Sequence, residues 1–404
     1  MRQDMRAEHV SCNLCGQDAF QPVFIDQESG FGQGFCQECG LIYVTPRMDA
    51  GSRAQFYATY GQKYPESFLV DPKNPYRQIA AKRAIFFEAF CRDLGEKPES
   101  LLEVGCSYGF FLEELKKKGS SIRMHGLDPS RSEVEYARRV NGLEHVRTGL
   151  LEDLKGEEER FDVIALFHVL EHLGEPMEAL RIIHGGLREG GLIWVEVPEA
   201  SQLKGDVIEY QHFISCQHLY EFSLVTLKGL LERAGFERVL HEETPLGFFL
   251  ESNQRAVYRK ASASRRTGIE KDVRSHSYLS VFRDRVMSIK RDVQAWLDRQ
   301  IQAGRPIFIY GGGFHTMGLL GLLEFPDGSI QASRAIQAII DDDEVKHGTS
   351  LEGLPILPPS VLNVHAEAGI IISTLVGEEK IASKLISQEK PGWDIKAIYR
   401  ELEQ

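Results

Sequence analysis

The segment Ser100-Leu-Leu-Glu-Val-Gly-Cys-Ser-Tyr-Gly-Phe-Phe-Leu112 runs from an apolar stretch through a glycine-rich turn into a second apolar stretch. This order predicts a strand, a tight loop and a helix. Gly105 and Gly109 let the backbone approach a ligand because they carry no Cβ, and the helix that follows presents free N–H groups. Glu103 adds a carboxylate at the end of the strand. The segment therefore predicts an α/β fold with a nucleoside-binding loop.

A second carboxylate follows at the spacing that a nucleoside site requires. Asp128 ends the apolar run Ile122–Leu127, about twenty residues after Gly109. A carboxylate at the end of the second strand can accept hydrogen bonds from both ribose hydroxyls.

The glycine spacing separates two kinds of nucleoside site. A dinucleotide site requires the third glycine of G-x-G-x-x-G. Here the order is Glu103-x-Gly105-x-Ser107-x-Gly109, which resembles the first motif of class I S-adenosylmethionine-dependent methyltransferases. Two later segments, Phe161–Leu173 and Leu187–Pro198, resemble the fourth and fifth strands of that family in the same order.

This resemblance implies a Rossmann-like α/β domain that binds S-adenosylmethionine. The residues it implies for the cofactor are Glu103, Gly105, Cys106, Ser107, Tyr108, Gly109, Asp128, Leu150, Leu151, Phe167 and His168. Leu150 and Leu151 fall where the family contacts adenine, although either residue can equally belong to the core. The unrelated alternative is a strand-turn-helix without this ligand.

Two C-x-x-C pairs near the N-terminus predict a structural zinc ion. Cys12 and Cys15 form the first pair, and Cys36 and Cys39 form the second. Two such turns aim four thiolates at one ion and leave no coordination position for water. A reactive dithiol is the alternative interpretation, but redox motifs of this kind do not normally occur as matched pairs.

The segment Cys39–Arg47 resembles the zinc-binding module of a family of three-part methyltransferases that methylate carbon atoms of nucleotide-linked deoxysugars. That resemblance spans nearly the whole chain. The domains it implies are a zinc module (1–50), a connector and lid (51–98), a methyltransferase domain (99–260) and a Rossmann-like acceptor-binding domain (261–404).

The connector is rich in tyrosine, which predicts a lid over a pocket. Tyr60 and Tyr64 are the candidates for substrate contact, with Tyr64 also a candidate catalytic residue. Ordinary packing of these tyrosines is the alternative. The related sugar methyltransferases carry a histidine in this region, and this chain has none there.

The segment Asp206–Ser223 holds a second group of polar candidates. By resemblance to the sugar C-methyltransferases, His218 matches their general base, whereas Gln217 stands where they have glutamate. A neutral imidazole can remove a proton near neutral pH. Gln217 is therefore a candidate supporting residue, and His212 and Tyr220 are candidates for substrate binding, with a purely structural role as the alternative for each histidine.

His168 ends the predicted fourth strand, where ligands bind in open α/β sheets, so it is a further catalytic candidate. Glu171 and His172 follow in a turn, and we expect them to cap and pack it. The remaining helices are predicted at 77–94, 109–118, 131–140, 175–187 and 223–234, which describes a parallel sheet covered on both faces.

The C-terminal third repeats the strand-glycine-helix order. One long helix is predicted over Lys271–Ala303, followed by the strand Pro306–Tyr310. The next residues, Gly311–His315, lead to another helix. Gly312, Gly313 and His315 are candidates for the substrate cleft, and a tight turn without a ligand is the alternative.

Composition limits the partners. The net charge of −12 over 404 residues argues against nucleic-acid binding, which depends on clustered basic residues. The apolar runs are shorter than the ~20 residues that span a bilayer. We therefore expect a cytoplasmic monomer or homodimer that binds neither membrane nor nucleic acid.

Three functions remain open on this basis. They are C-methylation of a nucleotide-linked sugar, O- or N-methylation of another small metabolite, and a catalytically silent S-adenosylmethionine-binding scaffold.

Overall fold

The computed structural model divides the chain into two compact units. The first contains Met1–Pro22, Gln33–Gln202 and Cys216–His276, and the second contains Val23–Gly32, Leu203–Ser215 and Ser277–Gln404. The residues that the structure describes are 6–25, 30–59, 69–156, 160–204, 218–244, 253–261, 268–324, 335–374 and 377–399. The C-x-x-C pairs, α3 of the connector and the central glycine loop thus share one unit.

The first unit is built on a seven-stranded sheet with the order β12-β13-β10-β9-β6-β7-β8. Its strands are β6 (Ser100–Val104), β7 (Arg123–Asp128), β8 (Val146–Thr148), β9 (Phe161–Phe167), β10 (Leu187–Pro198), β12 (Phe236–Thr244) and β13 (Asn253–Lys260). The chain first moves outward from β6 to β8 and then returns to place β9 on the other side of β6. The switch point of this doubly wound sheet therefore lies between β6 and β9.

One strand corrects the prediction of a parallel sheet. β13 runs antiparallel to both β10 and β12, whereas β6, β7, β8, β9 and β10 pair in parallel. The connection from Thr244 to Asn253 is too short for a parallel crossover, which needs a dozen or more residues. The last strand therefore turns back and enters the sheet in the opposite direction.

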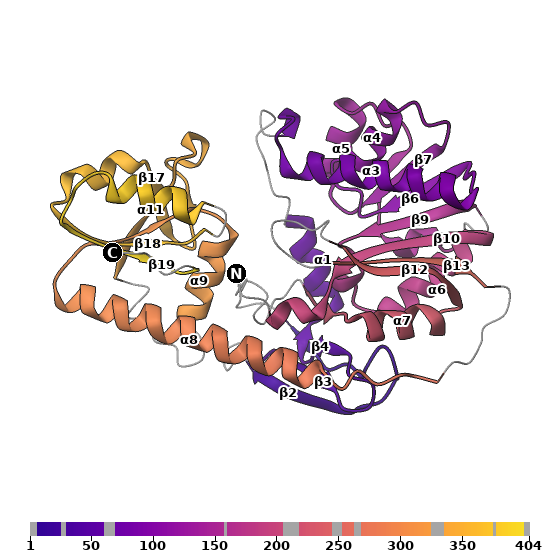
Figure 1. Ribbon diagram of the computed structural model, residues 1–404, viewed down its shortest axis with the longest axis horizontal. Coiled ribbons are helices and arrows are strands. Elements are labelled where there is room, and N and C mark those ends of the chain that lie inside the picture. The colour runs from indigo at the N-terminus through magenta and orange to yellow at the C-terminus, as the bar shows by residue number, and fades with distance from the viewer. Residues whose placement is uncertain are drawn as a thin grey trace. The chain divides into compact units, whose positions relative to one another are not determined.

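Helices cover both faces of this sheet (Figure 1). α3 (Pro75–Leu94), α4 (Phe110–Lys117) and α5 (Arg131–Arg139) lie on one side, and α6 (Pro176–Gly186) and α7 (Leu224–Arg233) lie on the other. α3 begins where the Asn74 side chain accepts the N–H of Tyr76 and ends at Gly95, whose φ of 71° is a left-handed C-cap. Three of its phenylalanines, Phe86, Phe87 and Phe90, surround Trp194 of β10 at ring distances of 5.7, 5.4 and 5.2 Å.

The cysteine pairs belong to a small four-stranded sheet with the order β11-β4-β3-β2. Its strands are β2 (Phe20–Ile25), β3 (Gly32–Cys36), β4 (Ile42–Val44) and β11 (Tyr220–Glu221). β11 comes from a distant part of the chain, and Tyr220 pairs with Tyr43 and Glu221 with Ile42. Leu14 and Leu41 share a hydrophobic cluster with Leu166 of the large sheet. The N-terminal module therefore forms a continuous core with the central domain.

The remaining short elements of the N-terminal region are β1 (Ala7–Glu8), which pairs with β5 (Arg47–Met48), and α1 (Ala50–Thr59).

The second unit has its own doubly wound sheet with the order β16-β17-β15-β14-β18-β19. Its strands are β14 (Ile307–Tyr310), β15 (Ile336–Ile340), β16 (Ser350–Leu351), β17 (Leu354–Leu357), β18 (Glu367–Ile372) and β19 (Gly392–Ala397), with helices α8 (Ser275–Gln302), α9 (Phe314–Glu324) and α11 (Glu378–Ile386). The predicted long helix and the predicted strand-glycine-helix order agree with α8, β14 and α9. No helix among the described ranges is both long and apolar enough to cross a bilayer.

Candidate functional site

A cavity of about 360 Å³ opens at the switch point of the large sheet. It lies at the carboxyl ends of β6 and β9, where ligands bind in open α/β folds. Its lining residues are Tyr76, Ala80, Arg83, Glu103, Gly105, Cys106, Ser107, Tyr108, Phe110, Phe111, Glu133, Phe167 and His168. The structure thus brings seven predicted cofactor residues together on one surface: Glu103, Gly105, Cys106, Ser107, Tyr108, Phe167 and His168.

The loop after β6 has an unusual backbone. Gly105, Ser107 and Gly109 have φ values of 71°, 48° and 73°, and Gly109 caps the start of α4. His168, on the opposite wall, has a φ of 55°. Left-handed backbone at Ser107 and His168 is costly because both residues carry a Cβ, and such strain is typical of ligand sites.

Glu103 presents a buried carboxylate to the cavity. The residue is 5% exposed, and its Oε2 accepts no hydrogen bond from the described parts of the chain. Burial raises the pKa of Glu103 to about 8, although Arg83 opposes this shift. On the same cavity wall, burial raises the pKa of Glu133 to about 7. A buried carboxyl oxygen without a partner among the described residues suits a cationic or hydrogen-bond-donating ligand group.

Asp128 lies behind the glycine loop rather than on the cavity wall. Its two carboxylate oxygens accept the backbone N–H groups of Ser107 and Ser130, each at 2.8 Å. Asp128 is 6% exposed, and this burial raises its pKa. The carboxylate therefore fixes the glycine loop to the start of α5.

The connector helix α3 supplies a wall of the cavity that sequence reasoning missed. Tyr76, Ala80 and Arg83 are spaced along one helical face and all three line the cavity. The Arg83 guanidinium lies 4.5 Å from the ring centre of Phe167, and its Nε donates to Oε2 of Glu196 at 2.6 Å. The i, i+4, i+7 spacing of these residues can be read from the sequence. The sequence does not show which other element this helical face packs against.

Glu196 fixes the Arg83 side chain beside the cavity. It is fully buried and also accepts Nε of Arg255 at 2.8 Å. Burial alone would raise the pKa of Glu196, but Arg83 and Arg255 hold it below its usual value. The ionised carboxylate therefore anchors Arg83 beside the cavity.

The two predicted adenine contacts are separated in the structure. Leu150 is 53% exposed, whereas Leu151 is buried in the hydrophobic cluster on the other face of the sheet, and neither lines the cavity. Phe110, Phe111 and Glu133 line the cavity instead, and sequence reasoning did not assign them. These residues lie in the first turns of α4 and α5. The two helices begin shortly after the predicted carboxylates Glu103 and Asp128, respectively.

A group of histidines and glutamates adjoins the cavity through His168. Nδ1 of His168 lies 3.4 Å from Oε1 of Glu171, and Nε2 of His172 lies 3.9 Å from the same oxygen. Burial alone would raise the pKa of Glu171, but the neighbouring imidazoles hold it below its usual value. Glu171 therefore remains ionised at neutral pH, which goes beyond the capping role that the sequence predicted.

His218 joins the same group from a later segment of the first unit. Its ring centre lies 4.7 Å from that of His172, and its Nδ1 lies 3.5 Å from Oε1 of Glu221. The next residue, Leu219, donates its N–H to the carbonyl of Glu171 at 2.9 Å and accepts the N–H of Val44 at 3.0 Å. The turn after β9 and strand β4 thus both hold the His218 segment by backbone hydrogen bonds.

Tyr220 has a structural position that corrects its prediction as a substrate-binding residue. It is 1% exposed, and its hydroxyl accepts from Arg47 and donates to the carbonyl of Gly174, both at 2.9 Å. Its ring stacks on those of Tyr43 and Phe222 at 6.4 and 5.8 Å in the core. The predicted residues Tyr60, Tyr64, His212 and Gln217 lie outside the described residues.

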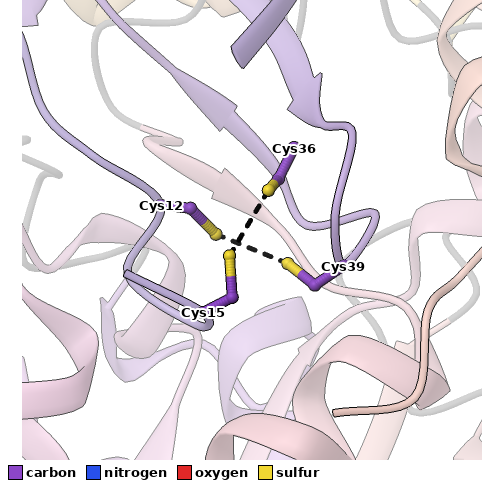
Figure 2. Close-up of side chains that lie close together, drawn as sticks. All are labelled: Cys12, Cys15, Cys36 and Cys39. Carbon is purple, nitrogen blue, oxygen red and sulfur yellow. Dashed lines mark hydrogen bonds between the residues drawn. The ribbon is translucent and has the colours of Figure 1, made fainter. Parts of the chain in front are cut away.

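The four predicted metal ligands converge (Figure 2). Sγ of Cys12 lies 3.4 Å from Sγ of Cys39, and Sγ of Cys15 lies 3.5 Å from Sγ of Cys36. All four sulfur atoms lie within 4.8 Å of one another. In a tetrahedral zinc site with bonds of about 2.3 Å, the sulfur atoms are about 3.8 Å apart. The cluster therefore has the size and donor set of such a site.

The glycine loop of the second unit repeats a contact seen in the first. Gly312 donates its N–H to the Asp341 carboxylate at 2.6 Å, just as Ser107 donates to Asp128. Nδ1 of His315 lies 2.5 Å from the Tyr399 hydroxyl, and Gly313 is exposed. The predicted cleft residues thus stand at the carboxyl edge of β14.

The central region of the chain is similar to known methyltransferases. Residues 76–242 match the protein family described as a methyltransferase domain. A ubiquinone biosynthesis O-methyltransferase of Ruegeria pomeroyi is 33% identical over 147 residues, which cover 34% of this chain and 56% of that protein. A protein of the same name from Xylella fastidiosa strain M23 is 28% identical over 131 residues, covering 31% and 52%. The crystal structure of the plantazolicin methyltransferase BamL is 14% identical, with a TM-score of 0.41 and coverage of 52% of this chain and 96% of that one.

The chain therefore contains a methyltransferase domain, and it spans about half the length of the curated relatives it matches. The matched residues begin in α3 and end in β12. They include the whole wall of the cavity.

Proposed function

We propose that this chain transfers a methyl group from S-adenosylmethionine to a small-molecule acceptor, with the cavity at the switch point as the cofactor site and His218 as the general base. The observation that carries the proposal is the buried, unpartnered oxygen of Glu103 beside the left-handed glycine loop, inside the matched methyltransferase domain.

The residues of the cavity fit S-adenosylmethionine by charge. Glu103 would accept the ammonium group of its methionine part, and Arg83 would face the carboxylate end. Glu133 would accept from hydroxyl groups, while the stacked rings of Tyr108 and Phe110, 5.7 Å apart, offer an aromatic surface. When bound, the cofactor supplies a methyl group on a sulfonium leaving group.

The protein then has two tasks, which are alignment and proton removal. The rigid loop, held by Asp128, and the anchored Arg83 would fix the methyl donor relative to the acceptor, because correct orientation contributes several kcal/mol to catalysis. His218 would remove the acceptor proton, a role that contributes about 10²–10⁴-fold. The buried Glu171 keeps negative charge beside this base.

For the acceptor, we propose a nucleotide-linked sugar that is methylated at carbon. The combination of four converging cysteines, a methyltransferase domain and a second doubly wound sheet supports this choice, because it matches the three-part family resemblance. The contact between Gly312 and Asp341 gives the second unit the same loop arrangement as the first, which suits a nucleotide group.

O-methylation of another small metabolite is the second candidate. The names of the curated relatives favour it, since they are O-methyltransferases. Their similarity covers about a third of this chain. The matched methyltransferase domain, residues 76–242, contains neither the cysteine cluster nor the C-terminal sheet. We therefore place carbon methylation first.

We further propose that Cys12, Cys15, Cys36 and Cys39 bind a structural zinc ion. Four thiolates close the coordination sphere and leave no position for a reacting water. The role of the ion would be to hold β3, β4 and, through β4, β11 in place.

The function can be tested by product analysis. The protein is incubated with S-adenosylmethionine and either nucleotide-linked keto sugars or hydroxylated aromatic compounds, and methylated products are identified by mass spectrometry and NMR. His218→Ala should lower turnover by about 10²–10⁴-fold without changing cofactor affinity. His145→Ala, at an exposed position of the same unit, is the matched control.

Two outcomes would contradict the proposal. Binding of S-adenosylmethionine without turnover on either acceptor class would favour a silent scaffold. For carbon methylation, the acceptor should also exchange hydrogen for deuterium in D₂O without the cofactor. Methylation at oxygen without such exchange would establish the second candidate instead.

A further inference from the structure

Two imidazole–carboxylate pairs in the first unit share one geometry. His168 with Glu171 and His218 with Glu221 are both separated by three residues, and Nδ1 faces Oε1 at 3.4 Å and 3.5 Å. Both glutamate side chains are 1% exposed, whereas the imidazoles are 13% and 17% exposed. In each pair the carboxylate is therefore more deeply buried than the ring.

We propose that Glu221 is a positioning residue for His218, and that it holds the imidazole with Nδ1–H toward the carboxylate, which makes Nε2 the nitrogen that takes the acceptor proton. This inference rests on the proposed function, which makes His218 the base. It answers a question that the sequence raised, because the amide of Gln217 cannot stabilise an imidazolium by charge. We propose that Glu221 supplies that charge instead.

The backbone explains why Glu221 is fixed. It pairs with Ile42 in the β11–β4 ladder, and Leu219, two residues earlier, is hydrogen-bonded on both sides, to Val44 and to Glu171. The carboxylate on this strand is buried, and a buried charge is expensive unless a counter-charge lies next to it. His218 is the ring that faces it within ion-pair distance.

The wider cluster supports a charged partner for His218. The titratable groups that face one another here are His168, Glu171, His172, His218 and Glu221. The cluster therefore holds two carboxylates against three imidazoles, and the neighbouring histidines hold the pKa of Glu171 low despite its burial.

The proton balance of the step is simple. The acceptor proton moves to Nε2 of His218, and the electron pair of the broken bond stays on the acceptor. The imidazolium then carries one proton on each nitrogen, with Nδ1–H toward Glu221. After methyl transfer, Nε2 returns its proton to water. A carboxylate in this position orients the ring and stabilises the imidazolium without taking the proton itself.

Two substitutions of Glu221 separate charge from orientation. Glu221→Gln keeps an oxygen that can accept from Nδ1–H but removes the charge, and Glu221→Met removes both at similar volume. Glu199→Gln is the matched control, because Glu199 is also a buried carboxylate of this unit and accepts from Ser201 and Leu224. Folding of each variant is checked by circular dichroism and by S-adenosylmethionine binding.

The ring tautomer gives a readout that does not depend on activity. In protein labelled with ¹⁵N-histidine, the His218 signals are assigned by their absence in His218→Ala. We expect the Nδ1–H tautomer in the wild type and in Glu221→Gln, and a mixture of tautomers in Glu221→Met. kcat should fall at least about tenfold in Glu221→Met and less in Glu221→Gln, with KM nearly unchanged. The acidic limb of the pH–rate profile should move in both variants and stay in place in Glu199→Gln.

Three results would overturn the inference. The first is an unchanged tautomer and kcat in Glu221→Met, and the second is an effect on KM alone. The third is a second metal ion that persists in Cys12→Ser and disappears in Glu171→Gln, since the cluster would then be a metal site. A different result would separate this inference from the proposed function. If His218→Ala keeps normal turnover, His218 is not the base. If Glu221→Met in the same set of experiments gives a mixture of tautomers, Glu221 still positions the His218 ring.

Discussion

Glu103 is a residue of the cavity whose protonation should affect cofactor binding. Its pKa of about 8 in the ligand-free protein means that much of the carboxyl is neutral at pH 7. A cationic ligand group favours the ionised form. We therefore expect S-adenosylmethionine affinity to increase as pH rises from about 6.5 to about 8.5 and binding below pH 8 to release protons.

Isothermal titration in two buffers of different ionisation enthalpy measures both effects. Glu103→Gln should bind about 1–3 kcal/mol more weakly and lose the proton release. Glu99→Gln, an exposed residue just before the same strand, should behave like the wild type. Equal pH dependence in Glu103→Gln would assign the effect to another group, with Glu133 the next candidate.

The raised pKa of Glu103 has the opposite effect on the stability of the ligand-free protein, which should fall as pH rises. An unfolded glutamate ionises near pH 4.3, whereas folded Glu103 retains its proton up to about pH 8. The folded state thus binds more protons in this window, so the contribution of Glu103 to stability is lost as pH rises through about 8. The difference in Tm between Glu103→Gln and the wild type should therefore shift in favour of the variant from pH 5 to pH 8.5. A constant difference would contradict the raised pKa.

At this scale, prediction from sequence succeeded where chemistry depends on a local motif. The glycine loop and Glu103 meet in the cavity because they are consecutive in the chain. Arg83 and Glu221 escaped prediction because their partners, Glu196 and His218, are set by tertiary pairing and by burial. A glutamate in an amphipathic segment looks the same in sequence whether water or an imidazole faces it.

α3 shows how an element outside the glycine motif shapes the ligand site. Ala80 is 4% exposed and lines the cavity, so a larger side chain there should occupy cofactor space. We expect Ala80→Leu to lower S-adenosylmethionine affinity at least about tenfold and stability by about 1–3 kcal/mol, the usual cost of overpacking. Lys82→Leu, at an exposed position of the same helix, should leave affinity unchanged. Calorimetry and thermal unfolding of both variants provide the comparison.

Element boundaries were largely predictable, and element direction was not. α3 agrees with its prediction because Asn74, Pro75 and Gly95 mark its ends. β13 runs in the opposite direction because the connection between β12 and β13 is too short for a parallel crossover. The prediction of a parallel sheet did not take the length of this connection into account. The pairing of β11 with β4 could not be read from either segment alone, because a two-residue strand carries no periodicity.

At the scale of the whole chain, the cysteine cluster should affect a residue that it does not touch. β4 follows the second cysteine pair and pairs with β11, directly after His218. We expect Cys12→Ser, or removal of zinc by a chelator, to lower turnover by about 10²-fold, because a shift of about 1 Å in a catalytic group can cost that much. S-adenosylmethionine affinity should change less, since the cavity is lined by other elements.

Metal analysis, turnover and calorimetry on the same samples separate these effects. Cys91→Ser is the control, because Cys91 is a buried thiol on α3 outside the cluster. A zinc-free protein with full turnover would show that β4 holds its position without the metal.

The pairing of β4 with β11, which come from distant parts of the chain, also determines how this protein can be recombined with its relatives. A chimaera that replaces only residues 6–48 would pair a foreign β4 with the native β11 and would place a foreign residue against Tyr220, which stacks on Tyr43 at 6.4 Å. The unit of exchange is therefore discontinuous in sequence and contains the N-terminal module together with residues 218–223. Shuffling libraries that keep these two segments from one parent should yield more folded, active members than libraries cut at a single point between them.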